Sequence, residues 1–99
     1  MTLNNEFTIF PTATFKEEFF NIFNYIKYKL KDPLSADKFY KTIQKKISTL
    51  NFMPERYVRI LYSNNKNKNL RKFTIDDYVI VYEVVRNTRS SLYFTYISW

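Results

Sequence analysis

The residues most suited to chemistry lie between positions 56 and 72, where cationic and aromatic side chains alternate. This stretch holds six basic residues and no acidic one. They are Arg56, Arg59, Lys66, Lys68, Arg71 and Lys72, with Tyr57 and Tyr62 among them. Cations pair with phosphates and aromatic rings stack on unpaired bases, so the pattern is typical of a surface that binds a single nucleic-acid strand. The alternative is a polar loop, residues 63–69, whose lysines only keep it solvated.

Three missing residue types limit the reactions that this chain can perform. It contains no Gly, no Cys and no His. Glycine-rich phosphate loops and dinucleotide-binding fingerprints need backbone approaches that a Cβ obstructs. Disulfides, thiolate nucleophiles, histidine bases and zinc sites with Cys or His ligands cannot be built. We therefore expect no cofactor and no metal, and any catalysis must use Arg, Lys, Tyr, Glu or Asp.

The charge and length of the chain indicate its class and its partners. Sixteen Lys and Arg against nine Asp and Glu give a formal charge of +7, which favours RNA, DNA or an acidic protein. A basic surface that only faces solvent would carry the same charge. We expect residues 1–99 to form one domain with an aromatic core, built from ten Phe, nine Tyr and one Trp. No apolar run has the length of a bilayer span and no basic segment precedes a hydrophobic one near Met1, so a cytoplasmic protein is expected.

The chemical residues must be positioned by a β-hairpin that spans residues 70–85. Asp76 and Asp77 tolerate turn geometry, and β-branched and aromatic residues flank them on both sides. The second strand, Tyr78 to Val85, carries one charge, at Glu83, which predicts a strand inside the sheet that is buried on both faces. The first strand alternates, so Arg71 and Phe73 should point to one face and Lys72 and Thr74 to the other.

A strand and a helix are expected before this hairpin. Glu6 to Phe10 alternates and is closed by Pro11, which predicts a first strand. Thr14 with Glu17 has the spacing of a capping box, and Thr12 is a competing helix cap. An apolar stripe at three- and four-residue steps then predicts a helix face in the core. Its members are Phe15, Phe19, Ile22, Phe23, Ile26 and Leu30.

A second helix is expected from Pro33 onward and should pack antiparallel to the first, because few residues connect the two. Its apolar face contains Ala36, Phe39, Tyr40, Ile43, Ile47 and Leu50. We expect Lys41, Lys45 and Lys46 to face away from the core, as a solvated helix face or as part of a specific site. Pro54 ends this helical pattern.

A last strand is expected from Ser91 to Trp99. Strict alternation would place Leu92, Phe94, Tyr96 and Ser98 on one face, and Tyr93, Thr95, Ile97 and Trp99 on the other. The predicted order is β-αα-βββ. This order indicates an α+β fold in which a helical hairpin covers one face of a mainly antiparallel four-stranded sheet.

Several of these segments also resemble a known family. A helix that ends in Ile43–Leu50 is followed by Met53-Pro54, and Arg71-Lys72-Phe73 leads across a short turn to the strand Tyr78–Val84. In order, spacing and length, over nearly the whole chain, this pattern resembles the RelE/ParE superfamily of small bacterial toxins. These are the toxic halves of type II toxin–antitoxin systems.

The resemblance implies two activities that one fold can carry. RelE-like members cut messenger RNA in the ribosomal decoding site by helping the 2′-hydroxyl attack its own phosphate. ParE-like members bind and poison DNA gyrase and are not nucleases. A third class is an inactive relative that only binds its partner. Fold alone does not choose between them. Because the basic stretch leads into Arg71 beside aromatic rings, ribosome-dependent cleavage is the expected activity, with gyrase inhibition as the alternative.

The resemblance also suggests catalytic residues, with two departures from the family pattern. Many RelE-like nucleases carry an arginine where this chain has Val79, and a histidine is absent near Tyr96. Arg71 remains at the family's recurrent strand arginine and would stabilise the phosphate's developing charge. Tyr96 would pass a proton to the leaving oxygen and Glu55 would act as base. The RNA-binding residues would be Arg56, Arg59, Lys66, Lys68 and Lys72.

Some of these residues could have purely structural roles instead. The resemblance also implies specific partners. Arg71 would instead pair with Glu83 or face solvent, and Tyr78 and Tyr82 would serve the core. The implied partners are an acidic antitoxin that folds as it wraps the toxin, together with the ribosome and mRNA, or DNA gyrase. No membrane partner is expected.

Overall fold

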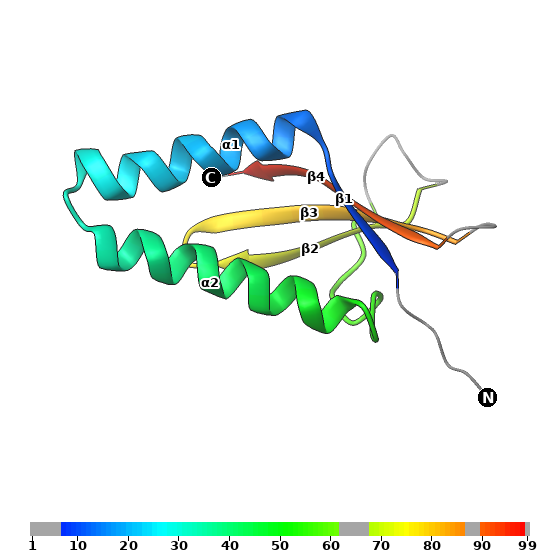
Figure 1. Cartoon of the computed structure of the whole chain (residues 1–99). Helices are drawn as coiled ribbons and strands as arrows, with labels where there is room; N and C mark the ends of the chain where they lie inside the picture. The colour runs from blue at the N-terminus through cyan, green and yellow to red at the C-terminus, as the bar shows by residue number, and fades with distance from the viewer. Residues whose placement is uncertain (1–6, 62–67, 87–89, 99) are drawn as a thin grey trace.

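The structure is a computed structural model that describes residues 7–61, 68–86 and 90–98. Two helices lie side by side on one face of a four-stranded sheet, and they run in opposite directions (Figure 1). The elements are β1 (Thr8–Pro11), α1 (Ala13–Asn24), a π-helical turn η1 (Tyr25–Lys29), α2 (Pro33–Leu50), β2 (Leu70–Ile75), β3 (Tyr78–Val85) and β4 (Ser91–Ser98). The predicted α+β fold and its β-αα-βββ order are confirmed.

The sheet has the strand order β1-β4-β3-β2. β1 pairs with β4 in parallel, and the other pairs are antiparallel, so the sheet is mainly antiparallel as predicted. The hairpin between β2 and β3 turns at Asp76 and Asp77, and Asp76 has a left-handed φ of 53°. In a chain without glycine, an aspartate is among the residues that tolerate this conformation best.

The core lies between the helices and the sheet, and its centre is aromatic. Tyr82 of β3 and Phe94 of β4 are fully buried and stack with ring centroids 5.5 Å apart. Ile22 of α1 and Leu50 of α2 are fully buried against the same cluster. The prediction that β3 lies inside the sheet is therefore confirmed, and so is the prediction that Tyr82 serves the core.

Helix α1 begins two residues earlier than the capping-box pattern indicates. The Oγ1 of Thr12 accepts a hydrogen bond of 3.1 Å from the backbone N–H of Phe15, and the same hydroxyl donates to the carbonyl of Thr95 in β4 at 2.7 Å. The box of Thr14 with Glu17 is thus wrong, and Thr12, the competing cap, is right. The hydrogen bond to β4 favours Thr12 as the helix cap. Local sequence spacing does not reveal this long-range contact.

The end of the first helical segment also differs from the prediction. In η1 the Leu30 N–H bonds to the Tyr25 carbonyl, five residues back, which widens the helix and rotates the later side chains about its axis. Leu30, predicted in the core, is 55% exposed. Lys31 then takes a left-handed φ of 52° and ends the helix, and the Asp32 side chain caps α2 by accepting from the Ser35 N–H.

The last strand does not alternate strictly, because a β-bulge interrupts it. Tyr82 pairs with Phe94 and the neighbouring Val81 pairs with Tyr96, so Thr95 is an extra residue on β4. The Thr95 hydroxyl donates to the Val81 carbonyl at 3.0 Å. Consequently Ile97, not Tyr96, joins Phe94 in the core, and Tyr96 is 43% exposed. The predicted set of alternating residues is wrong after the bulge.

Candidate functional site

Arg71 is held at the base of β2 by hydrogen bonds to the segment that precedes the strand. Its Nη1 donates to the carbonyl of Tyr57 at 2.8 Å and to the carbonyl of Glu55 at 3.1 Å, and its Nε donates to the Asn69 Oδ1 at 2.9 Å. Its Nη2 lies 3.8 Å from the Glu55 carboxylate, and the side chain is 16% exposed. Arg71 therefore pairs neither with Glu83 nor with solvent; it joins residues 55–57 to the sheet.

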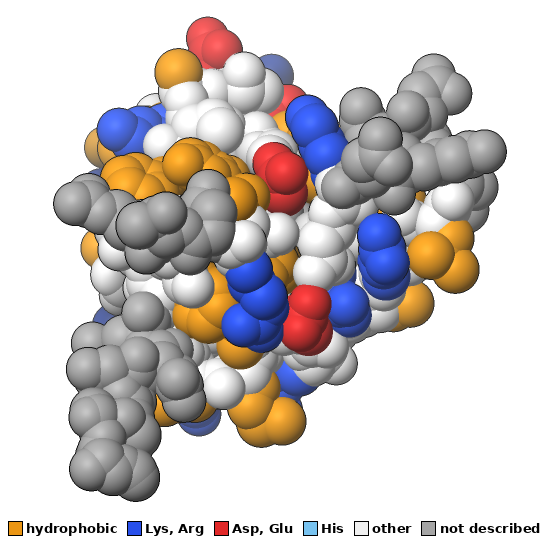
Figure 2. Space-filling model, turned by 90° about the vertical axis from the view of Figure 1, so that its right-hand side faces the viewer, with side chains coloured by type: hydrophobic (Ala, Val, Ile, Leu, Met, Phe, Trp, Pro, Cys, Tyr) orange, Lys and Arg blue, Asp and Glu red, His pale blue; other side chains and the backbone are white. Residues whose placement is uncertain are grey.

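Glu55 is the acidic residue that Arg71, Asn69 and Arg86 surround. Its Oε2 accepts from the Asn69 side-chain amide at 2.6 Å, and its Oε1 accepts from the Arg86 Nη2 at 3.1 Å. The Asn69 hydrogen bond, with further help from Arg86 and Arg71, lowers the pKa of Glu55 although partial burial opposes the shift. A carboxylate with a lowered pKa is a weaker proton acceptor than a free one. Basic and acidic side chains are interspersed on this end of the molecule (Figure 2).

The local fold around Glu55 follows from the end of α2. The Tyr82 hydroxyl donates to the carbonyl of Pro54 at 2.7 Å and so anchors the chain where the helix has ended. The following residues run along β2, since the Ile60 N–H donates to the Leu70 carbonyl at 2.8 Å and the Lys72 N–H donates to the Val58 carbonyl at 3.2 Å. Glu55 is thereby carried next to Arg71.

Tyr96 lies on the other face of the sheet. Arg71 is paired with Tyr82, whereas Tyr96 is paired with Val81. Paired residues share a face and consecutive residues point to opposite faces, so the sheet separates Tyr96 from Arg71. The structure thus brings Arg71 and Glu55 together and does not bring Tyr96 to them.

The predicted RNA-binding residues fall into separate groups. Arg56 lies over the ring of Tyr57, 5.5 Å from its centroid, and lines a hollow that Lys72 also lines. The Arg59 Nη2 is 3.4 Å from the carbonyl of Lys68, which places these two residues together. Lys66 and Tyr62 lie outside the described residues.

Lys46 was expected to face away from the core with Lys41 and Lys45, and this expectation is wrong for Lys46. Its Nζ lies 5.5 Å from the Tyr57 ring centroid and 5.7 Å from that of Phe73. Lys41 does face solvent and pairs with Asp37 at 3.0 Å. The position of Lys46 depends on how residues 55–57 pack against α2, so helical spacing alone did not indicate it.

Asn69 and Arg86 were also missed, although the hairpin itself contained a signal for them. The Val84 N–H donates to the carbonyl of Asn69 at 2.9 Å, so the register of the hairpin brings the residue before β2 next to the end of β3. Counting outward from the predicted turn at Asp76 and Asp77 would have placed Asn69 and Arg86 at the same end of the sheet.

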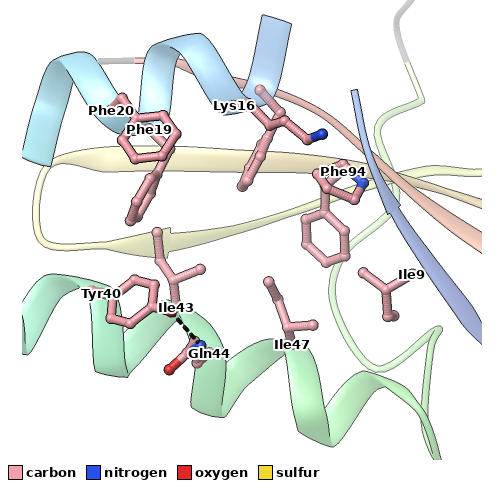
Figure 3. A pocket seen from close by; sticks show the side chains of 11 residues that line it. Ile9, Lys16, Phe19, Phe20, Tyr40, Ile43, Gln44, Ile47 and Phe94 are labelled. Carbon is pink, nitrogen blue, oxygen red and sulfur yellow. Dashed lines mark hydrogen bonds between the residues drawn. The ribbon is translucent and has the colours of Figure 1, made fainter. Parts of the chain in front are cut away.

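An apolar hollow of about 310 Å³ lies between the two helices and β1. Side chains of α1 and α2 point toward one another across it, and Ile9 of β1 closes one end (Figure 3). Phe19 stacks on Phe39 at 5.8 Å, whereas Phe20 is 58% exposed at the rim. Tyr40, predicted in the core, is 41% exposed and accepts a hydrogen bond from Gln44 at 2.8 Å. Such a lining suits apolar side chains of a partner more than a charged substrate.

The sequence comparisons identify the family. Residues 9–92 match the family model described as ParE toxin of type II toxin–antitoxin system, parDE. The chain belongs to the ParE toxin family. The match covers the chain from β1 into β4, and it confirms the resemblance to the RelE/ParE superfamily. No curated protein sequence matches the chain at a significant level.

As a ParE-family member, the chain is the toxin of a type II toxin–antitoxin system, and an antitoxin is its implied partner. Within the described residues, no three His, Cys, Asp or Glu side chains are grouped as metal ligands. No helix in this part of the chain has the length and apolar character that crossing a membrane requires.

Proposed function

We propose that this ParE-family toxin stops growth by binding DNA gyrase and not by cutting RNA. The observation that carries the proposal is the separation of Tyr96 from the other two candidate catalytic residues. Arg71 and Glu55 hold each other on the helix side of the sheet, and Tyr96 is on the opposite face.

The chemistry of RNA cleavage explains why this separation matters. A base at the 2′-hydroxyl, a donor at the phosphate and an acid at the leaving oxygen must lie within hydrogen-bond reach of one substrate. The guanidinium of Arg71 already directs three of its N–H donors to Glu55, Tyr57 and Asn69. Val79 stands where many RelE-like nucleases carry an arginine, and the chain has no histidine. These features support a toxin that acts by binding.

Ribosome-dependent mRNA cleavage is the second candidate, and one observation favours it. Lys72 and Tyr96 are both paired with Val81, so the helix-free face carries a cation and an exposed tyrosine in one cross-strand row. On this face Tyr96 would donate the proton and Lys72 would bind the phosphate. Arg71 and Glu55 would reach the substrate only if residues 55–57 moved away from β2.

Induced expression distinguishes the candidates. Gyrase poisoning produces double-strand DNA breaks and an SOS response, whereas cleavage produces loss of translation and cuts in ribosome-bound messages. Growth that continues unimpaired would indicate an inactive relative that only binds its partner. Purified toxin should also block supercoiling by purified gyrase, which tests the proposal without the cell.

A conservative tyrosine variant tests the catalytic alternative directly. Tyr96→Phe removes only a hydroxyl from an exposed side chain, so a toxin that acts by binding should keep its activity. Tyr93→Phe is the matched control, because Tyr93 is an exposed tyrosine on the same strand and face. If Tyr96→Phe abolishes message cleavage and toxicity while Tyr93→Phe does not, the RNA mechanism replaces the gyrase mechanism.

We further propose that the antitoxin is a small acidic protein, because the toxin carries a charge of +7. The prediction is checked in the neighbouring reading frames and by co-purification. A toxin directed at gyrase or at ribosomes would act in the cytoplasm, where both targets are found.

A further inference from the structure

A second hollow between the helices, of about 410 Å³, has a lining that is almost wholly aromatic. The described residues that line it are Phe19, Phe20 and Phe23 of α1, and Asp37 and Tyr40 of α2. Phe19 and Phe23 are four residues apart on their helix and so share a face. Asp37 and Tyr40 are three residues apart on theirs, with the same result. Four rings and one carboxylate therefore meet at one place, which we call the aromatic cage.

The rings of the aromatic cage stand at steep angles to one another. Figure 3 shows Phe19 and Phe20 on α1 and Tyr40 on α2. The Phe19 centroid lies 5.7 Å from that of Phe20 and 5.7 Å from that of Tyr40. The planes of Phe19 and Phe20 are 71° apart, and those of Phe23 and Tyr40 are 79° apart. Rings at such angles form walls and not one flat stack, so a ligand between them contacts several rings at once.

The rings and the carboxylate of the aromatic cage all attract positive charge. The face of an aromatic ring is partially negative and holds a cation that lies over it. Lys27 demonstrates this on Phe23, since its Nζ lies 5.8 Å from the ring centroid, although Lys27 does not line the hollow. Asp37 adds a full negative charge, and its exposed ion pair with Lys41 is of a kind that contributes little energy. The cage therefore favours a cation, and salt screens the more distant charges of this basic chain.

We propose that the aromatic cage binds the quaternary ammonium group of a small molecule, as choline carries it. A guanidinium or a primary ammonium brings several N–H donors that need acceptors. The side-chain acceptors of the cage are the Asp37 carboxylate, which pairs with Lys41, and the Tyr40 hydroxyl, which already accepts from Gln44. A quaternary ammonium has no N–H to satisfy, and its methyl groups contact the rings directly, so it loses less on leaving water. The inference does not depend on whether gyrase is the target.

The test is a titration of choline with the full-length toxin, followed through the NMR signal of the choline methyl protons. Binding between ring faces should move this signal upfield in a saturable way, because the ring currents shield the protons. The probe for charge is the uncharged carbon analogue of choline, in which a tert-butyl group replaces the trimethylammonium group. The analogue has the same shape and should bind at least about tenfold more weakly, since it gains nothing from the ring faces or from Asp37 as a cation does.

Three variants locate the binding in the aromatic cage. Phe20→Leu and Asp37→Asn should each weaken choline binding about threefold to tenfold, and both side chains are exposed, so the fold should tolerate the changes. Lys41→Gln frees the Asp37 carboxylate and should strengthen binding about twofold. Phe52→Leu is the matched control for the lost ring. Phe52 is an exposed phenylalanine that does not line the cage, so this variant should bind choline like the wild type.

Several results would overturn the proposal. They are the absence of a saturable shift, equal binding of choline and its uncharged analogue, and a loss in Phe52→Leu as large as that in Phe20→Leu. Arginine amide serves as a probe for the side chain of a partner protein. If it binds more tightly than choline, and through Phe20 and Asp37, the cage takes a guanidinium and the proposal is wrong.

Discussion

Arg71 and Glu55 are joined more strongly through the backbone than through their charges. The guanidinium lies 3.8 Å from the Glu55 carboxylate, whereas it donates a hydrogen bond of 3.1 Å to the Glu55 carbonyl. An even shorter bond, of 2.8 Å, reaches the carbonyl of Tyr57. Arg71 therefore holds the course of residues 55–57 along β2, and this role explains its position without any catalysis.

Replacing Arg71 by alanine should destabilise the fold. The variant leaves the carbonyls of Glu55 and Tyr57 without their donor, and we expect a loss of about 1–3 kcal/mol in the free energy of unfolding. Urea denaturation measures the change. Arg71→Lys should recover only part of the loss, because an ammonium group cannot reproduce the planar fork.

The control for this prediction is Arg86→Ala. Arg86 also contacts Glu55, but its side chain is 55% exposed, so its removal should cost clearly less than the removal of Arg71. Equal losses for the two variants would show that the carboxylate, and not the backbone, is what Arg71 stabilises.

Glu55 should make the fold less stable as the pH falls into the acidic range. Its pKa is lowered in the folded state, chiefly by the hydrogen bond from Asn69, so the unfolded chain binds the proton more readily. This contribution is fully present above the ordinary carboxyl pKa of 4.5 and is lost as the pH falls through the lower folded value. Glu55→Gln should lack it. Unfolding curves recorded across the acid range should therefore converge for the two proteins at low pH, and a constant difference would contradict the assignment.

Tyr82 should produce the opposite dependence at alkaline pH. Burial raises the pKa of Tyr82 from 10.0 to about 12, so the folded state favours the neutral hydroxyl. Its stabilising effect is present below pH 10 and is lost between about pH 10 and 12, as the unfolded chain ionises first. Tyr82→Phe should cost about 1–2 kcal/mol at neutral pH, because the Pro54 carbonyl loses its donor.

The alkaline loss of stability should be shallower in Tyr82→Phe than in the wild type. Burial also raises the pKa of Tyr78, which accounts for a remaining slope. An unchanged slope in Tyr82→Phe would show that the buried hydroxyl does not titrate in this range.

Thr12 and Thr14 allow a direct comparison of two candidate helix caps. Thr12→Ala removes both the cap of α1 and the bond to Thr95, and it should cost about 1–2 kcal/mol. Thr14→Ala, at an exposed position inside the helix, should change the stability by no more than about 0.5 kcal/mol. Chemical denaturation of the two variants makes the comparison, and a larger effect at Thr14 would restore the capping box.

Local sequence patterns were sufficient to predict the helices and strands and to recognise the family. The turn at Asp76 and Asp77 with its flanking apolar residues predicted the hairpin, and the apolar spacing of residues 15–26 and 36–50 predicted both helices. These signals depend on side chains a few positions apart, which the sequence contains directly. The order of the elements then predicted an α+β sheet covered by a helical hairpin.

The arrangement of the candidate site depends on contacts between residues that are far apart in the sequence. The bulge at Thr95 moves Tyr96 out of the expected alternation and places it on the face opposite Arg71. Glu55 contacts Arg71 and Arg86 because Tyr82 anchors Pro54 and residues 58–60 follow β2. Lys46 lies beside Tyr57 because the same contacts place residues 55–57 against α2.

The amino-acid sequence by itself thus determined the elements, their order and the residue types available for chemistry. Which of those residues face one another was decided by the tertiary structure alone. The physical reason is that a single extra residue in a strand, or one buried hydroxyl on a loop carbonyl, redirects side chains far apart in the chain, and no local period records it.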